Sequence, residues 1–390
     1  MTNDRRENKR FDNIKAYFIF ENKKYQVVNI SSTGLLVECK EGFDEKLVTR
    51  WRSGSFEFKL LDIVNNSDLY FKGKAVRFFH DESSERVTKM GVSFTPVGRR
   101  PDTCRNIAVG GGKGGVGKSI VSINLALTLS QTCQKKVIIL DGDFGNANCH
   151  TLLGITRLEK SIEDYFSSGL ALEEVITPSR YPGLFLIGGA SNKIDRHLDK
   201  SEEKTRLIED IKKLEALYLI LDLGAGVGDN TLDLFNIADT RIVVMTPQYT
   251  SLQNAYSFVK SAFFRELESR KELMPPLWDA KQNPEKIFDA VQQLCMDHPL
   301  RADFERFRKR QRFKIIANMI TEEKDISVIK NFQNVVREFL GVESTICGGF
   351  TQDMVVKNSV NKMAPFVIES AGNVNVREMN KVAQHIEMMK

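Results

Sequence analysis

The 390-residue sequence has little of what marks several common classes of protein. Its six cysteines form no C-x-x-C pair, which excludes zinc knuckles and redox motifs of that kind and fits a reducing compartment. No apolar run approaches the roughly 20 residues that span a bilayer, and the N-terminus has no apolar signal core. The formal net charge of +5 is too small to indicate nucleic acid or membrane by itself, and the five histidines show no metal-ligand spacing.

The apolar pattern before residue 100 is typical of closely spaced β-strands. Short β-prone runs alternate with turns such as Glu21-Asn22 and Asn65–Asp68. Strands of this kind predict a small antiparallel barrel. We expect strands at 16–21, 25–30, 34–38, 55–61, 69–79 and 87–94.

After residue 105 the pattern changes to strands alternating with helices, which predicts a mostly parallel sheet with crossover helices. The Pro- and Gly-containing junction 96–101 has linker composition. The sequence therefore predicts two domains, a barrel at 1–98 and an α/β domain at 106–390, joined by a linker at 99–105. A mostly helical stretch at about 258–312 is too long for an ordinary crossover, so we expect an inserted lid or docking surface there.

The most informative motif is Gly111–Ser119, GGKGGVGKS, which contains the phosphate-loop pattern from Gly112 to Ser119. Glycines let successive backbone N–H groups point at phosphate oxygens, Lys118 supplies a positive charge, and Ser119 supplies a hydroxyl for Mg²⁺. A short apolar strand at 107–109 precedes the loop and an apolar helix at 120–129 follows it. That context favours a nucleotide site over a flexible glycine turn.

Two carboxylates follow neighbouring predicted strands. Asp143 comes after the strand at 136–140, and Asp222 ends an apolar strand at 217–221 in the manner of a Walker B acid. Because the carboxyl ends of parallel strands meet at one edge of a sheet, both acids should face the phosphate crevice. There they could orient water or hold Mg²⁺ through water.

These motifs together resemble the deviant-Walker ATPases of the MinD/ParA family, with the FlhG/FleN flagellar-number regulators as the nearest likeness. The residues that carry the resemblance are GGKGGVGKS, DGDFGNAN and LILDLGAG. It implies an α/β P-loop NTPase fold and slow, dimerisation-dependent hydrolysis of ATP to ADP and phosphate.

The resemblance also implies roles for single residues. Lys113 matches the signature lysine, which reaches the partner's phosphates in an ATP-bound homodimer, and Asp143 matches the acid that positions the attacking water. Catalysis would rest on Lys113, Lys118 and Asp143, and Mg²⁺ would be held by Ser119, Asp143 and Asp222, the acids through water. ATP would contact Gly112, Gly114, Gly115, Val116, Gly117, Lys118, Ser119, Ile120 and Asn318. Asn318 matches the adenine-reading asparagine, although a satisfied polar residue at a strand end is the alternative.

Two motifs in the first domain resemble those of the PilZ family, which binds cyclic di-GMP. Arg6 and Arg10 match its RxxxR motif, and Asn29, Ser31 and Gly34 match [D/N]xSxxG. Two guanidinium forks four residues apart suit a guanine or phosphate clamp. The resemblance implies cyclic di-GMP as a ligand of these five residues, and a degenerate barrel used only for docking is the alternative.

Two further segments have both a purely structural and a functional interpretation. The basic stretch 301–314 interleaves arginines with phenylalanines, which would suit DNA or anionic lipid, but a solvated helix with its Phe side against the sheet is favoured. The helical spacing of Val376, Met379, Val382, Ile386 and Met389 favours a core-facing helix over a membrane sensor.

The sequence thus predicts a cytoplasmic ATP-dependent dimerisation switch that responds to cyclic di-GMP. By family analogy it would regulate the placement or number of a surface structure such as flagella, through a partner in the flagellar or motility machinery. It would act at a cell pole or at the inner face of the membrane. One alternative is a non-hydrolysing, nucleotide-bound scaffold that recruits a transcriptional or motility partner. Another is a DNA-associated, cargo-positioning ATPase.

Overall fold

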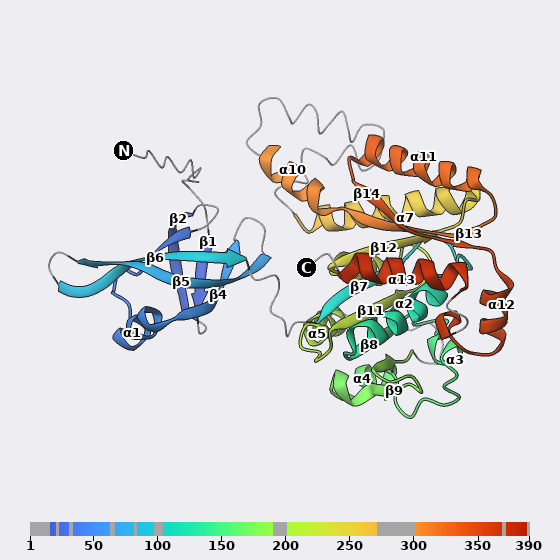
Figure 1. Ribbon diagram of the computed structural model, residues 1–390, viewed down its shortest axis with the longest axis horizontal. Coiled ribbons are helices and arrows are strands. Elements are labelled where there is room, and N and C mark those ends of the chain that lie inside the picture. Colours follow the sequence, from blue (N-terminus) through green and yellow to red (C-terminus); the bar gives the residue numbers. More distant parts are fainter. Residues whose placement is uncertain are drawn as a thin grey trace. The chain divides into compact units, whose positions relative to one another are not determined.

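The computed structural model divides the chain into two compact units between Pro101 and Asp102 (Figure 1). The structure describes residues 16–20, 23–30, 34–62, 67–81, 84–96, 104–189, 201–270, 301–368 and 372–387.

The first unit is an antiparallel barrel, as predicted. Its six strands follow the order β1-β2-β3-β6-β5-β4, and pairing of β1 with β4 closes the ring. The strands are β1 (Ala16–Phe20), β2 (Lys23–Ile30), β3 (Gly34–Glu38), β4 (Ser55–Asp62), β5 (Ser67–Asp81) and β6 (Ser84–Pro96).

One helix of this unit, α1 (Glu45–Ser53), was not predicted. The Asp44 carboxylate caps it by accepting from the N–H groups of Lys46 and Leu47 at 2.9 and 3.3 Å. Trp51 of α1 is fully buried and makes edge contacts with aromatic rings of the barrel, including Phe18 and Phe20. The helix therefore supplies part of the barrel core.

The second unit is an eight-stranded sheet with the order β14-β13-β12-β7-β11-β8-β10-β9. Every neighbouring pair is parallel except β9 and β10, which confirms the predicted mostly parallel sheet. The strands are β7 (Arg105–Gly110), β8 (Val137–Gly142), β9 (Ile176–Pro178), β10 (Leu184–Ile187), β11 (Tyr218–Leu223), β12 (Thr240–Met245), β13 (Phe313–Ile320) and β14 (Ser344–Thr351).

Helices cover both faces of this sheet (Figure 1). The face that packs on α2 and α13 forms one core, and the face that packs on α6, α7 and α11 forms the other. The helices are α2 (Lys118–Cys133), α3 (Cys149–Leu152), α4 (Ile162–Ser168), α5 (Ser201–Ile211), α6 (Asp229–Asn236), α7 (Tyr249–Glu268), α10 (Arg301–Arg310), α11 (Glu323–Leu340), α12 (Met354–Asn361) and α13 (Val374–Glu387), with short 3₁₀ turns at Leu172–Val175 and Phe366–Ile368.

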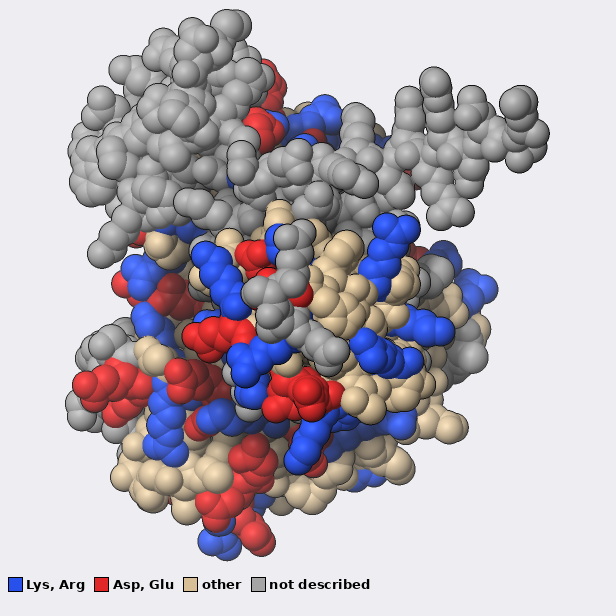
Figure 2. Space-filling view, turned by 90° about the vertical axis from the view of Figure 1, so that its left-hand side faces the viewer, with Lys and Arg blue, Asp and Glu red and all other residues tan. Residues whose placement is uncertain are grey.

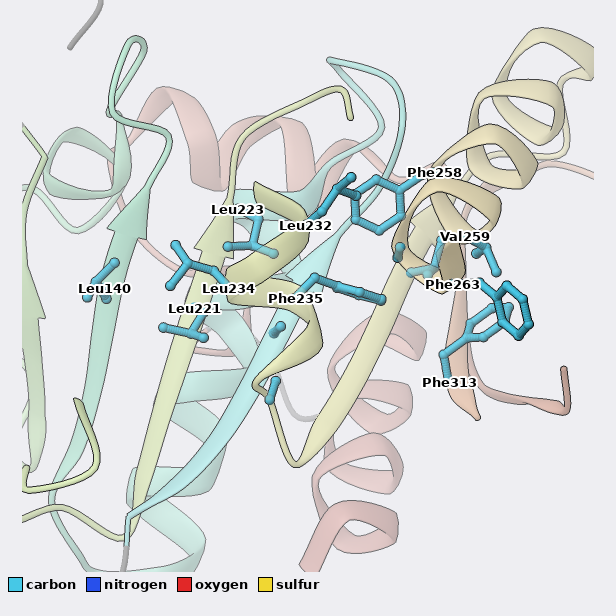
Figure 3. Packing of buried hydrophobic residues seen from close by; sticks show 14 of the residues in the cluster. Leu140, Leu221, Leu223, Leu232, Leu234, Phe235, Phe258, Val259, Phe263 and Phe313 are labelled. Carbon is cyan, nitrogen blue, oxygen red and sulfur yellow. The ribbon is translucent and has the colours of Figure 1, made fainter. Parts of the chain in front are cut away.

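Alternation along the strands divides the apolar side chains between the two cores. In β11, Leu221 and Leu223 join the core under α6 and α7, whereas Ile220 faces α2 and α13. Figure 3 shows Leu221 and Leu223 on the same side as Phe235 of α6 and Phe258 of α7. Burying each such side chain contributes about 1.5–3 kcal/mol, so the central strands, and the loops at their ends, are firmly held.

The predicted helical insertion needs correction at its start. Helix α7 runs without a break from Tyr249 to Glu268, and its Phe258 and Phe263 are buried in the sheet-facing core. Residues 258–268 are thus part of a core helix that packs on β12, not of an inserted lid. Residues 271–300 lie outside the described residues.

Helix α10 has the structural role that the sequence favoured, with its phenylalanine side chains in the core. Phe304 and Phe307 are buried, and the Phe307 ring packs against Phe263 of α7. Arg308 of the same helix forms an ion pair with Glu305 at 2.7 Å.

Figure 2 shows one face of the molecule, on which the described basic and acidic side chains are interspersed. Neither sign of charge therefore dominates that face.

The last helix faces the core, as predicted. Val376, Met379, Val382 and Ile386 of α13 are all buried, and Met389 lies outside the described residues. Within the ranges that the structure describes, no helix is both long enough and apolar enough to cross a membrane.

Candidate functional site

The phosphate loop connects β7, which ends at Gly110, to α2, which begins at Lys118. Gly115 and Gly117 have φ angles of +77° and +94°. Only glycine adopts this left-handed backbone at little cost, so these two positions give the loop its turn. The first N–H groups of α2 then face the end of the sheet where an anion would bind.

The first two glycines of the motif are required because a side chain would have no space, not because of their φ angles. A Cβ atom at Gly112 would lie 2.0 Å from the carbonyl oxygen of Asn254 in α7, and one at Gly111 would lie 2.8 Å from that of Val244 in β12. The loop therefore packs directly on backbone of β12 and α7, and that contact holds its shape.

The Lys118 side chain is 8% exposed, and its Nζ donates to the carbonyl of Lys113 at 3.3 Å. Burial lowers the pKa of Lys118, while Asp222 and Asp143 act in the opposite direction. The ammonium is thus held inside the loop with two carboxylates nearby. This is where a phosphoryl group would meet it.

Asp222, at the end of β11, is buried beside the loop and the start of α2. Its Oδ1 accepts from the hydroxyl of Ser122 at 2.7 Å, and its Oδ2 accepts from the Cys149 thiol at 3.2 Å. Burial raises the pKa of Asp222, and hydrogen bonds from Ser119, Ser122 and Cys149 oppose that rise.

Ser119 and Asp222 fit a magnesium ion. The two side chains are in hydrogen-bond contact, so a hydroxyl and a carboxylate already converge at the phosphate loop. Oxygen donors of these two types are the ligands that Mg²⁺ prefers at phosphate sites.

Asp143 follows β8 at the mouth of the site and is half-buried. Its Oδ1 accepts from the N–H of Asn146 at 3.1 Å, and a Cβ at Gly224 would lie 3.3 Å from its carboxyl carbon. The loops after β8 and β11 therefore meet at Asp143, which brings the two predicted acids to one edge of the sheet.

Sequence reasoning assigned no role to Asp141, two residues earlier. Its carboxylate is fully buried and accepts from the N–H groups of Asn148 and Cys149, both at 3.0 Å. Burial, followed by the neighbouring Asp222, raises the pKa of Asp141 to about 7. Asp141 holds the loop that carries Asp143. The D-x-D spacing at the end of an apolar strand was the available signal.

Lys113 lies at the outer side of the phosphate loop. Its Nζ donates to the Thr250 hydroxyl, in the first turn of α7, at 3.1 Å. Only its backbone carbonyl contacts Lys118. The two lysines of the motif thus have different surroundings, one inside the loop and one on the neighbouring helix.

Asn318 lies near the end of β13, against the phosphate loop. Its Nδ2 donates to the Val116 carbonyl at 2.8 Å, and its Oδ1 accepts from the N–H of Met319 at 2.9 Å. Both ends of the Asn318 amide thus have hydrogen-bond partners within the chain, which agrees with the alternative of a satisfied polar residue at a strand end. Adenine recognition by Asn318 stays a prediction.

The predicted cyclic di-GMP residues are described only in part. Arg6, Arg10 and Ser31 lie outside the described residues. Asn29 is in β2, paired with Leu36, and Gly34 opens β3, paired with Ser93. The barrel therefore has the backbone of this motif on adjacent strands, and the ligand stays a prediction.

Residues 103–269 match the family model described as "ParA: NUBPL iron-transfer P-loop NTPase". The segment begins just before β7 and ends with α7. It therefore includes the phosphate loop, Asp143 and Asp222.

Curated relatives match stretches of similar length. The flagellum site-determining protein YlxH of Helicobacter pylori is 35% identical over 156 residues, covering 40% of this chain and 52% of that protein. The antiactivator FleN of Pseudomonas aeruginosa is 34% identical over 157 residues, covering 40% and 55%. The chain thus spans about half the length of the curated relatives it matches.

Solved structures show the fold. The cell division ATPase MinD of Pyrococcus furiosus superposes with a TM-score of 0.50 at 16% identity, covering 73% of this chain and 99% of that one. MinD of Pyrococcus horikoshii, solved with Mg-ADP, gives 0.50 at 18%, covering 73% and 97%. At under 25% identity these likenesses show the fold alone: the second unit is a MinD-like α/β domain with a mostly parallel sheet.

Proposed function

We propose that the chain is an ATP-dependent dimerisation switch whose state responds to cyclic di-GMP. ATP would bind at the phosphate loop and join two copies of the chain. Hydrolysis to ADP and phosphate would separate them. The observation that carries the proposal is the different placement of the two lysines of one loop.

Within one copy, the site has what phosphoryl transfer needs except one charge. The backbone from Gly112 to Ile120 would cradle the phosphates, and Lys118 would neutralise their outer oxygens. Mg²⁺, held by Ser119 and through water by the acids, would draw charge from the β- and γ-phosphates. Asp143, at the mouth of the site, would orient the attacking water.

The missing charge would come from the partner copy. Lys113 is engaged by Thr250 on the outer side of the loop, away from the buried Lys118 ammonium. A second copy facing this edge would present its own Lys113 to the γ-phosphate. That cation would act as an arginine finger does, by stabilising charge that develops during transfer. Turnover would be slow and conditional on dimerisation.

The barrel would sense cyclic di-GMP. Arg6 and Arg10 would clamp the ligand with their guanidinium forks, and Asn29, Ser31 and Gly34 would supply the remaining contacts. The antiparallel barrel and the strand positions of Asn29 and Gly34 support this assignment. Two relatives, a flagellum site-determining protein and an antiactivator, support flagellar placement or number as the output.

Size-exclusion chromatography with light scattering tests the switch in four states: no ligand, ATP, cyclic di-GMP, and both. We expect monomers without ATP, dimers with ATP, and a shifted dimer fraction when cyclic di-GMP is added. A mass that never changes with ATP would contradict the switch and favour the scaffold alternative.

Calorimetry tests the sensor separately. The double variant Arg6→Ala/Arg10→Ala should lose cyclic di-GMP binding while it keeps ATP binding, since these arginines precede the barrel. Binding of cyclic di-GMP as tight as that of the parent chain would show that the assigned residues are wrong.

A further inference from the structure

Asn318 lies where the end of β13 meets the phosphate loop. Its Nδ2 donates to the carbonyl of Val116 at 2.8 Å, although the two residues are 202 positions apart. A Cβ atom at Gly117 would lie only 2.2 Å from the same nitrogen. The side-chain amide of Asn318 therefore lies directly against the peptide unit that joins Val116 to Gly117.

The backbone at the end of β13 sets the orientation of that amide. Oδ1 of Asn318 accepts from the N–H of Met319 at 2.9 Å, and Met319 has a φ angle of +57°. A residue other than glycine adopts this left-handed backbone at a cost, and it does so most often at functional sites. The pairing of β13 with β14 also shifts register between Ala317 and Ile320, and such irregularities redirect side chains. The irregular end of β13 thus directs the Asn318 side chain at the phosphate loop.

This contact fixes the direction of one N–H group of the loop. A peptide unit is planar and trans, so its C=O and N–H groups point in opposite directions. Because the Val116 carbonyl points at Asn318, the N–H of Gly117 points away from Asn318. Within the described part of the chain, this N–H donates to no other group. Backbone N–H groups at the start of a helix are the donors that hold phosphate oxygens, so the Gly117 N–H is available to a phosphate.

We propose that Asn318 is a positioning residue of the phosphate loop. It holds the peptide unit between Val116 and Gly117 so that the Gly117 N–H meets a phosphate oxygen. The inference rests on the proposed function, since it concerns the same nucleotide site, and it assigns Asn318 to the phosphates rather than to the base. The affinity for the phosphate groups, not the choice of base, therefore depends on this side chain.

The test measures by calorimetry how the full chain binds Mg-ADP and the magnesium complex of inorganic triphosphate, which has no base. Asn318→Ala should weaken both ligands by the same factor, about fivefold, because the hydrogen bond that orients the loop is lost. Asn334→Ala is the matched control, since this amide on α11 accepts from Arg337 at 3.0 Å, and it should leave both affinities as in the parent chain. A loss of ADP affinity with unchanged triphosphate binding would assign Asn318 to the base and overturn the proposal.

Thermal unfolding separates an effect on binding from an effect on folding. A purely structural role would lower the unfolding temperature of Asn318→Ala but leave both affinities of the folded chain unchanged, and that result would also overturn the proposal. Asn318→Ser, whose side chain is too short to reach Val116, repeats the comparison if alanine prevents folding.

The outcome is independent of the switch. Both ligands are measured without ATP, so equal losses would support the role of Asn318 even if ATP failed to join two copies of the parent chain. If the parent chain dimerises with ATP but Asn318→Ala binds triphosphate as the parent does, only the role of Asn318 is wrong.

Discussion

At Gly112 the chain has no space for a side chain, although its φ angle is ordinary. The Asn254 carbonyl that fills the space belongs to the helix that also carries Thr250, the partner of Lys113. The shape of the phosphate loop is therefore set by α7 as well as by its own glycines.

Gly112→Ala should lower the unfolding free energy of the second unit by about 1–3 kcal/mol, because backbone must move to admit the methyl group. ATP binding should weaken with it. Denaturant unfolding and calorimetric titration measure the two effects. Gly228→Ala is the matched control, since its Cβ meets nothing within 4 Å. Equal stability of the two variants would contradict the packing argument.

The residues that the sequence could predict are those with a local signature. Lys118, at the start of α2, and Asp222, near the end of β11, each lie within a recognisable local motif. The contact of Cys149 with Asp222 joins residues 73 positions apart and has no local pattern. Asn318 is similar, because its hydrogen bond to Val116 spans 202 positions. Such partners depend on the strand order, which no short segment specifies.

Among the elements, α6 and α7 are tied by a charged contact at the edge of their core. The Arg265 guanidinium of α7 donates to both oxygens of Asp233 in α6, at 2.8 and 2.9 Å, and Lys204 of α5 also donates to Asp233. Burial pushes the pKa of Asp233 upward, but hydrogen bonds from Arg265 and Lys204 outweigh it and leave the pKa below its usual value.

Asp233→Asn should therefore destabilise the second unit by about 2 kcal/mol at neutral pH, since hydrogen bonds to charged groups are the stronger ones. The stabilisation is present above the pKa of an unfolded Asp, about 3.9, and is lost as the pH falls through the lower folded pKa. The difference between parent and variant should shrink in acid. Unfolding measured across this range tests it, with the more exposed Asp229→Asn as the milder control. A difference that grows in acid would contradict the assigned sign.

Element boundaries followed from the sequence where the apolar period was regular. The six barrel strands were predicted from β-prone runs and turns, and β7, β8 and β11 from short apolar runs, whereas β9, β10 and β14 were not predicted. Helix α1 was missed because its pattern is short, although Asp44 and the spacing of Leu47, Val48 and Trp51 form a capped, one-sided helix. The start of the predicted insertion was wrong because the apolar face of α7 continues to Leu267, and the core, not the local sequence, decides where that helix ends.

At the scale of the whole molecule, the central claim is that one catalytic site is built from two copies of the chain. Each site would combine Asp143 and Lys118 of one copy with Lys113 of the other. A closed twofold dimer would then contain two such composite sites. The contact of Lys113 with Thr250, apart from the buried Lys118 ammonium, supports this arrangement.

The most direct test mixes two inactive variants, Lys113→Ala and Asp143→Ala, and measures phosphate release. A mixed dimer would hold one site with Asp143 from one copy and Lys113 from the other. The equal mixture should therefore regain about one quarter of the parent activity, because half of the dimers are mixed and each has one intact site. If Lys113 instead serves its own copy, every site lacks one group, and a mixture as inactive as its two components would contradict the account.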